Sequence, residues 1–284
     1  HDTITSAGLS GTAGVAGTVM VNKFTQRVDT KVSNSAISGN RVDITAKNHV
    51  GARNDGGAGA LGGVGAGLVV SLNSFEDRAS VSVINNSNVT SGLNANSYDL
   101  NVGATTEHDI SQKVANVQVG GVTVGANIMI TSLNDSLSIT GKDQDASDSM
   151  NSLVSDALDK ANQSESFKNQ GSNLSGLSDD EKNNADNIQG DARSLLTTTG
   201  GSNTQSGVFA IVSDSTLKSS GATKVTAKEL NDVAMTGGGA SGSISASAGA
   251  SVGMLNVNSN NKAIVENSKL YGKTVNVAAN RGTL

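Results

Sequence analysis

A short turn-like unit recurs four times along the chain, and this internal repeat constrains the fold more than any other feature. The unit begins at Asn34, Asn86, Asp214 and Asn267. Each start is followed at once by Ser and, three positions after the start, by an aliphatic residue. The spacings are 52, 128 and 53 residues. A period of this length predicts stacked units, none of which can bury its apolar face alone.

The long middle spacing indicates an insertion. Residues 142–206 hold eleven Asp or Glu and five Lys or Arg, a net charge of −6, whereas the whole 284-residue chain carries −5. We therefore expect four repeats of about 52 residues with the third one interrupted. Residues 1–141 hold repeats 1, 2 and the start of 3, residues 142–206 are an acidic insertion, and residues 207–284 complete repeats 3 and 4. The absence of an initial Met and a stop in mid-pattern predict a fragment of a much longer chain.

Segments beside the turn units alternate apolar and polar residues, as in 18–22, 41–45 and 274–277. Such alternation is typical of half-buried β-strands. The chain contains 34 Gly, four Phe and two Tyr, but no Pro, Cys or Trp. The scarcity of bulky aromatic side chains suits a narrow interior of Val, Ile, Ala and Leu between stacked strands. We predict an all-β solenoid, a parallel β-helix with about two coils per repeat, in which Asn side chains stack as ladders.

The insertion has the pattern of two helices. Apolar residues from Met150 to Ala161 fall on one helical face, and Ser178–Glu181 forms a capping box before a second apolar stripe at 185–195. We predict an α-helical hairpin that interrupts the β-repeats.

The predicted hairpin has two interpretations, which the sequence leaves open. It is either a solvated ornament or a contact surface for a partner, since function concentrates on long excursions from a rigid scaffold. The candidate partner-contact residues are ten of its charged side chains: Asp148, Asp156, Asp159, Lys160, Asp179, Asp180, Glu181, Asp186, Asp191 and Arg193.

No motif in the sequence carries enzyme chemistry, and we expect no catalytic residues, no bound metal and no cofactor. His49 aligns with Asp232 in the third repeat, which predicts a turn position and not a ligand. Residues 143–154 resemble a calcium loop, but Asp148 stands where that loop needs Gly and Val154 where it needs Glu. No apolar run is long enough to span a bilayer. The chain has a low charge and no stripe of basic side chains that could bind nucleic acid.

Three segments give the repeats a family resemblance: Val-Asn-Lys-Phe (21–24), Asn-Ser-Ala-Ile-Ser-Gly (34–39) and Val-Asp-Ile-Thr-Ala (42–46). With the Gly-rich stretches between them, they resemble the repeats of large secreted bacterial proteins of the filamentous-haemagglutinin and autotransporter type, most closely the leukotoxins of fusobacteria. The resemblance covers everything except 142–206. It implies a right-handed parallel β-helix, export through an outer-membrane secretion partner, and a secreted or cell-surface location. It supplies no catalytic residues.

Three functions are compatible with these observations. The first is a segment of a leukotoxin-like exotoxin that binds host cells such as leukocytes or serves as a rigid stalk. The second is an adhesin or biofilm-matrix segment that binds a host protein or glycan. The third and most remote is a polysaccharide-active β-helix enzyme. The partners implied are a host cell surface, the flanking repeats of the parent chain and the secretion partner.

Overall fold

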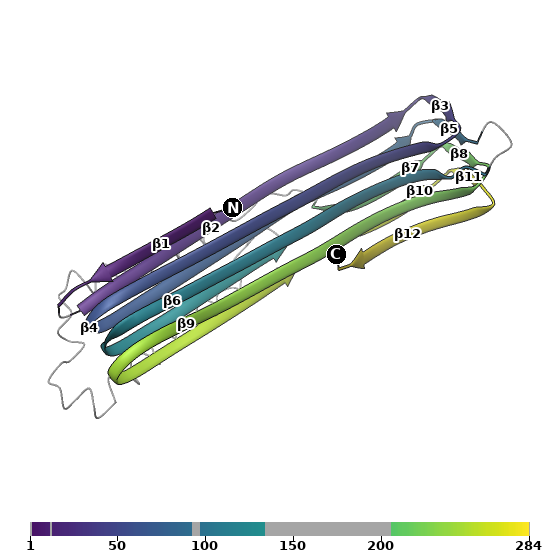
Figure 1. Ribbon diagram of the computed structural model, residues 1–284. Helices are drawn as coiled ribbons and strands as arrows, with labels where there is room; N and C mark the ends of the chain where they lie inside the picture. The colour runs from purple at the N-terminus through teal and green to yellow at the C-terminus, as the bar shows by residue number, and fades with distance from the viewer. Residues whose placement is uncertain (1, 12, 93–96, 134–205, 284) are drawn as a thin grey trace.

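The computed structural model describes residues 2–11, 13–92, 97–133 and 206–283 (Figure 1). These residues form β-strands and turns, and they contain no helix. The strands are β1 (Asp2–Leu9), β2 (Ala13–Ser33), β3 (Ala36–Gly39), β4 (Val42–Ile84), β5 (Asn88–Ser91), β6 (Leu100–Leu133), β7 (Gly207–Ser213), β8 (Thr216–Ser219), β9 (Ala222–Val257), β10 (Asn261–Glu266), β11 (Lys269–Tyr271) and β12 (Thr274–Gly282).

Every strand pairing in the described residues is parallel. One sheet has eight strands, in the order β10-β7-β4-β6-β9-β12 with β1 and β2 also paired to β4. The other has four strands, in the order β11-β8-β5-β3. The prediction of a nearly all-β, parallel, stacked architecture is therefore confirmed.

The register of the small sheet matches the repeat found in the sequence. Ala36 lies opposite Asn88, Asn88 opposite Thr216, and Thr216 opposite Lys269. The chain therefore returns to one ladder position at the same intervals that separate the four turn units. One repeat is thus one circuit of the chain, which we call a layer. The expectation of two coils per repeat is wrong.

The reason is that the long strands bend back on themselves. In Figure 1, β4, β6 and β9 run to one end of the molecule, reverse, and run back beside their own first halves. Side chains meet between the two legs of one strand: Asn54 donates to Asn73 in β4 at 2.5 Å, and Thr131 donates to Gln112 in β6 at 2.8 Å. Each bent strand uses as many residues as two shorter strands would use. One repeat therefore completes one circuit and not two.

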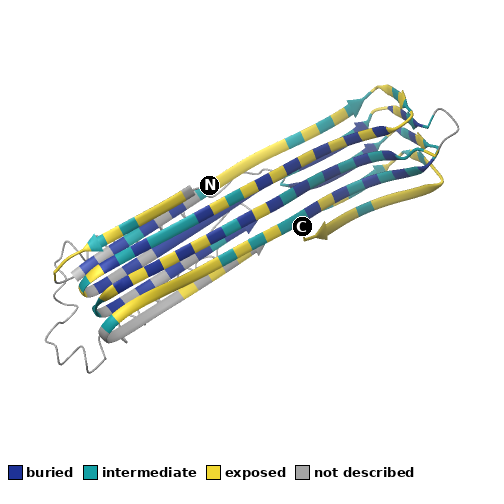
Figure 2. Cartoon of the chain, viewed as in Figure 1, coloured by how far each residue is buried: buried dark blue, intermediate teal, exposed yellow. Residues whose placement is uncertain are grey.

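The space between the legs is the core, and burial alternates along the first legs of β4 and β6 (Figure 2). The largest apolar cluster lies near the small sheet and includes Val81, Leu100, Leu217 and Val225, each fully buried. Complete burial of one such side chain contributes about 1.5–3 kcal/mol. Two smaller clusters follow along the legs, one around Phe75 and one around Met20 and Met129.

The insertion predicted at 142–206 lies almost wholly outside the described residues, and so does its helical hairpin. All ten candidate partner-contact residues, from Asp148 to Arg193, fall there. The strands on either side, β6 before the insertion and β7 after it, belong to the same eight-stranded sheet.

Close packing at the bends requires particular glycines. A Cβ on Gly120 would overlap the carbonyl oxygen of Gly62 in the neighbouring layer, whereas a Cβ on Gly238 would meet nothing within 4 Å. We predict that Gly120→Ala lowers the free energy of unfolding by about 1–3 kcal/mol. The matched control Gly238→Ala should stay within about 1 kcal/mol of the parent. Urea denaturation followed by circular dichroism measures both. Equal stabilities of the two variants would contradict this packing.

Candidate functional site

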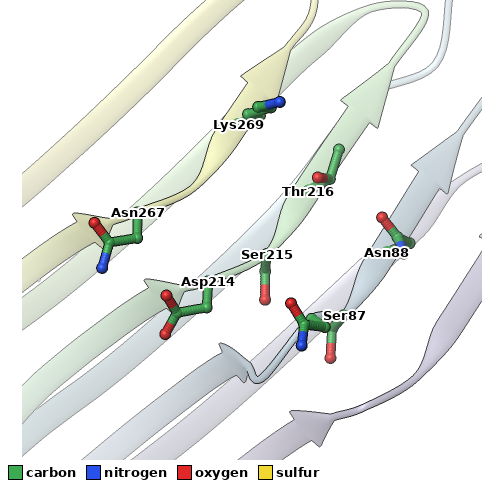
Figure 3. A pocket seen from close by; sticks show the side chains of 8 residues that line it. Ser87, Asn88, Asp214, Ser215, Thr216, Asn267 and Lys269 are labelled. Carbon is green, nitrogen blue, oxygen red and sulfur yellow. The ribbon is translucent and has the colours of Figure 1, made fainter.

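The four turn units lie at the end of the molecule that carries the small sheet, and Figure 3 shows part of this region. Asn34, Asn86, Asp214 and Asn267 have φ values of 50, 58, 48 and 46°. Among residues other than Gly, Asn and Asp adopt this left-handed conformation most readily. The first residue of each repeat unit is therefore fixed by backbone geometry.

Two of the four turn serines, Ser87 and Ser268, bond to the adjacent layer through their side chains. Ser87 Oγ donates to the Ile84 carbonyl at 2.7 Å and accepts from the Ser35 N–H at 3.4 Å. In the same way, Ser268 Oγ donates to the Glu266 carbonyl at 2.6 Å and accepts from the Ser215 N–H at 3.1 Å. These serines close their own turns and join them to the adjacent layer.

The residues around these serines line a shallow surface groove of about 250 Å³. Asn86, Asp214 and Asn267 are exposed and begin the same turn in successive layers. Figure 3 shows Asp214 and Asn267 at corresponding points of adjacent layers, and Lys269 adds a cation to the lining. The complete lining is Asn86, Ser87, Asn88, Asp214, Ser215, Thr216, Asn267 and Lys269. A row of amide and carboxylate groups at the strand spacing of about 4.8 Å suits a ligand with repeated hydroxyl or amide groups.

A second polar feature joins the second layer to the third. Asp99 accepts hydrogen bonds from Lys224 Nζ and from the Ala222 N–H, both at 2.8 Å. The Lys224 hydrogen bond, followed by that of Ala222, holds the pKa of Asp99 below its ordinary value.

A chain of buried polar groups crosses the interior. His108 Nε2 lies 2.9 Å from Asp77 Oδ2, and His108 Nδ1 lies 2.7 Å from Asn231 Oδ1. Asn231 donates to Glu229, which also accepts from Ser259. The imidazole of His108 thus lies between the Asp77 carboxylate and the Asn231 amide oxygen, and Asn231 links it to the Glu229 carboxylate.

The exposed fractions of His108, Asp77 and Glu229 are all 0%. The rings of Phe75 and His108 pack edge to face, with their centroids 6.4 Å apart. No substrate reaches the ring in this position, so we assign the chain of groups a structural role.

Sequence reasoning missed this cluster, although the strand phase could have found it. His108 alternates with buried Thr106 and Ile110, which places it on the inward face. His49, in contrast, is an exposed strand residue 3.5 Å from Glu107, and its third-layer equivalent is Leu230. The alignment of His49 with Asp232 and its assignment to a turn are wrong.

The described residues contain no group of three or more His, Cys, Asp or Glu able to hold a metal ion. Within the same part of the chain, no helix has the length and apolar character needed to cross a membrane. No protein-family model, curated protein or solved structure matches this chain.

Acid sensitivity tests the Asp99 contact. The folded pKa of Asp99 is depressed, so its stabilisation is present above the unfolded pKa of about 3.9 and is lost as the pH falls through the folded value. We expect Asp99→Asn to be less stable than the parent near neutral pH and the difference to disappear in strong acid. Urea denaturation over a pH series measures this. Asp232→Asn, at an exposed position of β9, is the control and should show no such convergence.

The buried imidazole gives a second prediction. His108→Leu leaves the Asp77 carboxylate buried without its partner, which costs about 3–5 kcal/mol of unfolding free energy. Adding Asp77→Val removes the unpaired charge, so the double variant should recover part of that loss. Chemical denaturation of both variants measures the effect. A double variant less stable than His108→Leu would contradict the assigned contact between His108 and Asp77.

Proposed function

We propose that this chain is a non-enzymatic segment of a large secreted bacterial repeat protein, similar to the leukotoxins of fusobacteria. In this proposal its repeats form a right-handed parallel β-helix that binds host cells or acts as a rigid stalk. The observation that carries the proposal is the stacking of four repeat units in one continuous register. Right-handedness follows from the strong preference of parallel strand connections for that hand.

The stalk role is supported by how the layers are joined. Backbone ladders connect each layer to the next, and the turn serines add side-chain bonds in the same direction. Asn side chains of the interior also bond between layers, as Asn22 does to Asn73 at 3.2 Å. A stack joined in this way resists bending and grows longer by adding repeats.

The groove favours a second candidate function, an adhesin or biofilm-matrix segment that binds a glycan or protein. Asn86, Asp214 and Asn267 present amide and carboxylate groups to solvent, while the serines between them are already bonded within the fold. Pairs of such groups at regular spacing suit the hydroxyls of a sugar chain.

The proposed location is the bacterial surface or the medium, reached through an outer-membrane secretion partner. A chain without Cys or Pro has no disulfide to form and no slow prolyl isomerisation to complete after it crosses a pore unfolded. In the parent protein, flanking repeats would continue the stack.

Binding of the fluorescently labelled chain to leukocytes, followed by flow cytometry, tests the proposal. One variant replaces residues 142–206 by a short Gly/Ser turn. A second carries Asn86→Gly, Asp214→Gly and Asn267→Gly, which remove the groove side chains but keep positive φ accessible. The control carries Lys47→Ala, Asp109→Ala and Lys113→Ala at exposed strand positions.

We expect saturable binding by the parent and the control. Loss of binding in the first variant assigns recognition to the insertion, and loss in the second assigns it to the groove. If the parent folds normally but does not bind leukocytes, the binding role is refuted. The same experiment on glycan-coated beads separates the adhesin function from the toxin function.

A further inference from the structure

The second leg of β4 has buried apolar residues on its outward face as well as on its inward one. The inward side is identified by a contact across the core, in which Asn73 accepts a hydrogen bond from Asn54 of the first leg. Successive residues of a strand point to opposite faces, so Val70 and Leu72 point outward. Their exposed fractions are nevertheless only 1% and 2%.

Ladder neighbours alone do not bury this outward face. The described residues form two sheets, and the smaller one lies at one end of the molecule, away from Val70 and Leu72 (Figure 1). At outward positions nearer that end, the side chains of β4 are partly exposed: Arg78, Ser82 and Ile84. The stretch around Val70 and Leu72 is therefore a surface that fits a covering partner.

The ladder extends this apolar character over four strands. At every second position from 64 to 72 of β4, β4 and its ladder equivalents in β2, β6 and β9 carry only Val, Leu, Ile, Ala, Met or Gly. We call these positions the apolar block. At about 3.3 Å per residue and about 4.8 Å between strands, the block measures about 26 by 19 Å. A continuous apolar area of this size marks an interaction site. The two rows at Val70 and Leu72 are Val19, Val70, Ile128 and Val252, and Val21, Leu72, Ile130 and Met254.

The insertion leaves and rejoins the ladder beside the apolar block. Leu133, the last residue of β6, lies opposite Phe75, and Gly207, the first residue of β7, lies opposite Arg78. Residues 134–206 therefore stand where β4 has only the two residues between Phe75 and Arg78. Leu72 is three positions before Phe75, about 10 Å along the strand. Both ends of the insertion are thus anchored at the border of the block.

The two apolar stripes predicted in the insertion match the block in size. As a helix, Met150 to Ala161 is about 17 Å long, close to the width of the block across its four strands. A second stripe follows at 185–195. Two helices side by side, each about 10 Å in diameter, cover about 20 Å along the strands, most of the length of the block.

The charge beside the block favours the insertion over a second copy of the same surface. At outward positions of β2 and β4 beyond the block, cations outnumber anions: Lys23, Arg27, Lys31 and Arg78 against Asp29 and Glu76. Residues 142–206 carry a net charge of −6. Opposite net charges attract, whereas two copies of one basic surface repel each other.

We propose that the apolar block is the docking site of residues 142–206, whose two apolar stripes pack on it. The insertion then forms an outer cover of the stack, with its charged side chains directed toward solvent. Anchoring at both ends keeps the insertion close to its site, which raises its effective concentration above that of any free partner. This inference concerns contacts within the chain and does not depend on the host-binding proposal.

Thiol accessibility tests the docking. The chain contains no Cys, so Leu72→Cys introduces a single thiol in the block. We expect this thiol to react with a maleimide at least about ten-fold more slowly in the full chain than in a chain with 142–206 replaced by a short Gly/Ser turn. Asp109→Cys, at an exposed position of β6, is the control and should react equally fast in both chains. Circular dichroism verifies that the shortened chain remains β-rich.

Three results of this experiment would overturn the proposal. Fast reaction of Leu72→Cys in the full chain would show that the block is open. Equal protection in the full and shortened chains at every concentration would show that another part of the molecule covers it. Protection of the full chain that disappears on dilution would show that a second copy is the occupant.

A second pair of variants keeps the insertion in place and does not depend on the shortened chain. Leu153→Asp with Leu158→Asp puts two charges on the first apolar stripe, and Ser152→Asp with Ser155→Asp puts the same charges on the opposite side of the predicted helix. In the Leu72→Cys background, the stripe variant should react at least about ten-fold faster than the parent, because a charge is not buried against an apolar face. The matched control should react at the parent rate. Equal rates for the two variants would contradict docking through the stripe.

Discussion

The whole structure depends on in-register parallel hydrogen bonding between successive layers of the stack. The backbone of a strand finds its partner only in the preceding or following layer, so each repeat must preserve the length and phase of the one before it. Where the chain adds residues, it does so away from the ladder. The second layer has six residues more than the first between its small-sheet strand and its next long strand, and the ladder resumes at Leu100. A shift of one residue would exchange the inward and outward faces along an entire leg.

The interior is unusually polar for a stack built on aliphatic residues. Three apolar clusters alternate with buried amides, hydroxyls and the hydrogen-bonded pair of His108 and Asp77. Buried polar groups are costly unless they are bonded, and their bonds are directional, so they penalise any other register more strongly than Val or Leu would. The amide and hydroxyl contacts inside β4 and β6 also align the two legs of a bent strand. Apolar packing thus supplies stability in this molecule, and the polar contacts fix the alignment of its layers.

Much of this arrangement can be predicted from the sequence because repetition makes spacing visible. The equivalence of the four turn units follows from their sequence context alone, and so does the pairing of Phe24 with Phe75, whose rings stack at 5.1 Å. The number of circuits per repeat could not be predicted, because alternation with period two is identical in two short strands and in one bent strand. The alignment of His49 failed because it was shifted by two positions from the ladder, and such a shift leaves the inward and outward faces unchanged. The groove combines residues of three layers, and no local motif marks it.

The long spacing between paired strands also determines how such a chain can acquire its structure. Every strand pair described joins residues separated by 51 to 129 positions. No hairpin between neighbouring strands can form early and stabilise the chain. The chain therefore loses the entropy of closing a long loop before the first ladder of hydrogen bonds forms. Proteins dominated by distant contacts fold slowly for this reason. Once one layer exists, its edge serves as a template, and each further layer closes against a surface that is already ordered. We therefore expect formation of the first layer to limit the folding rate, and further layers to add by growth along the stack.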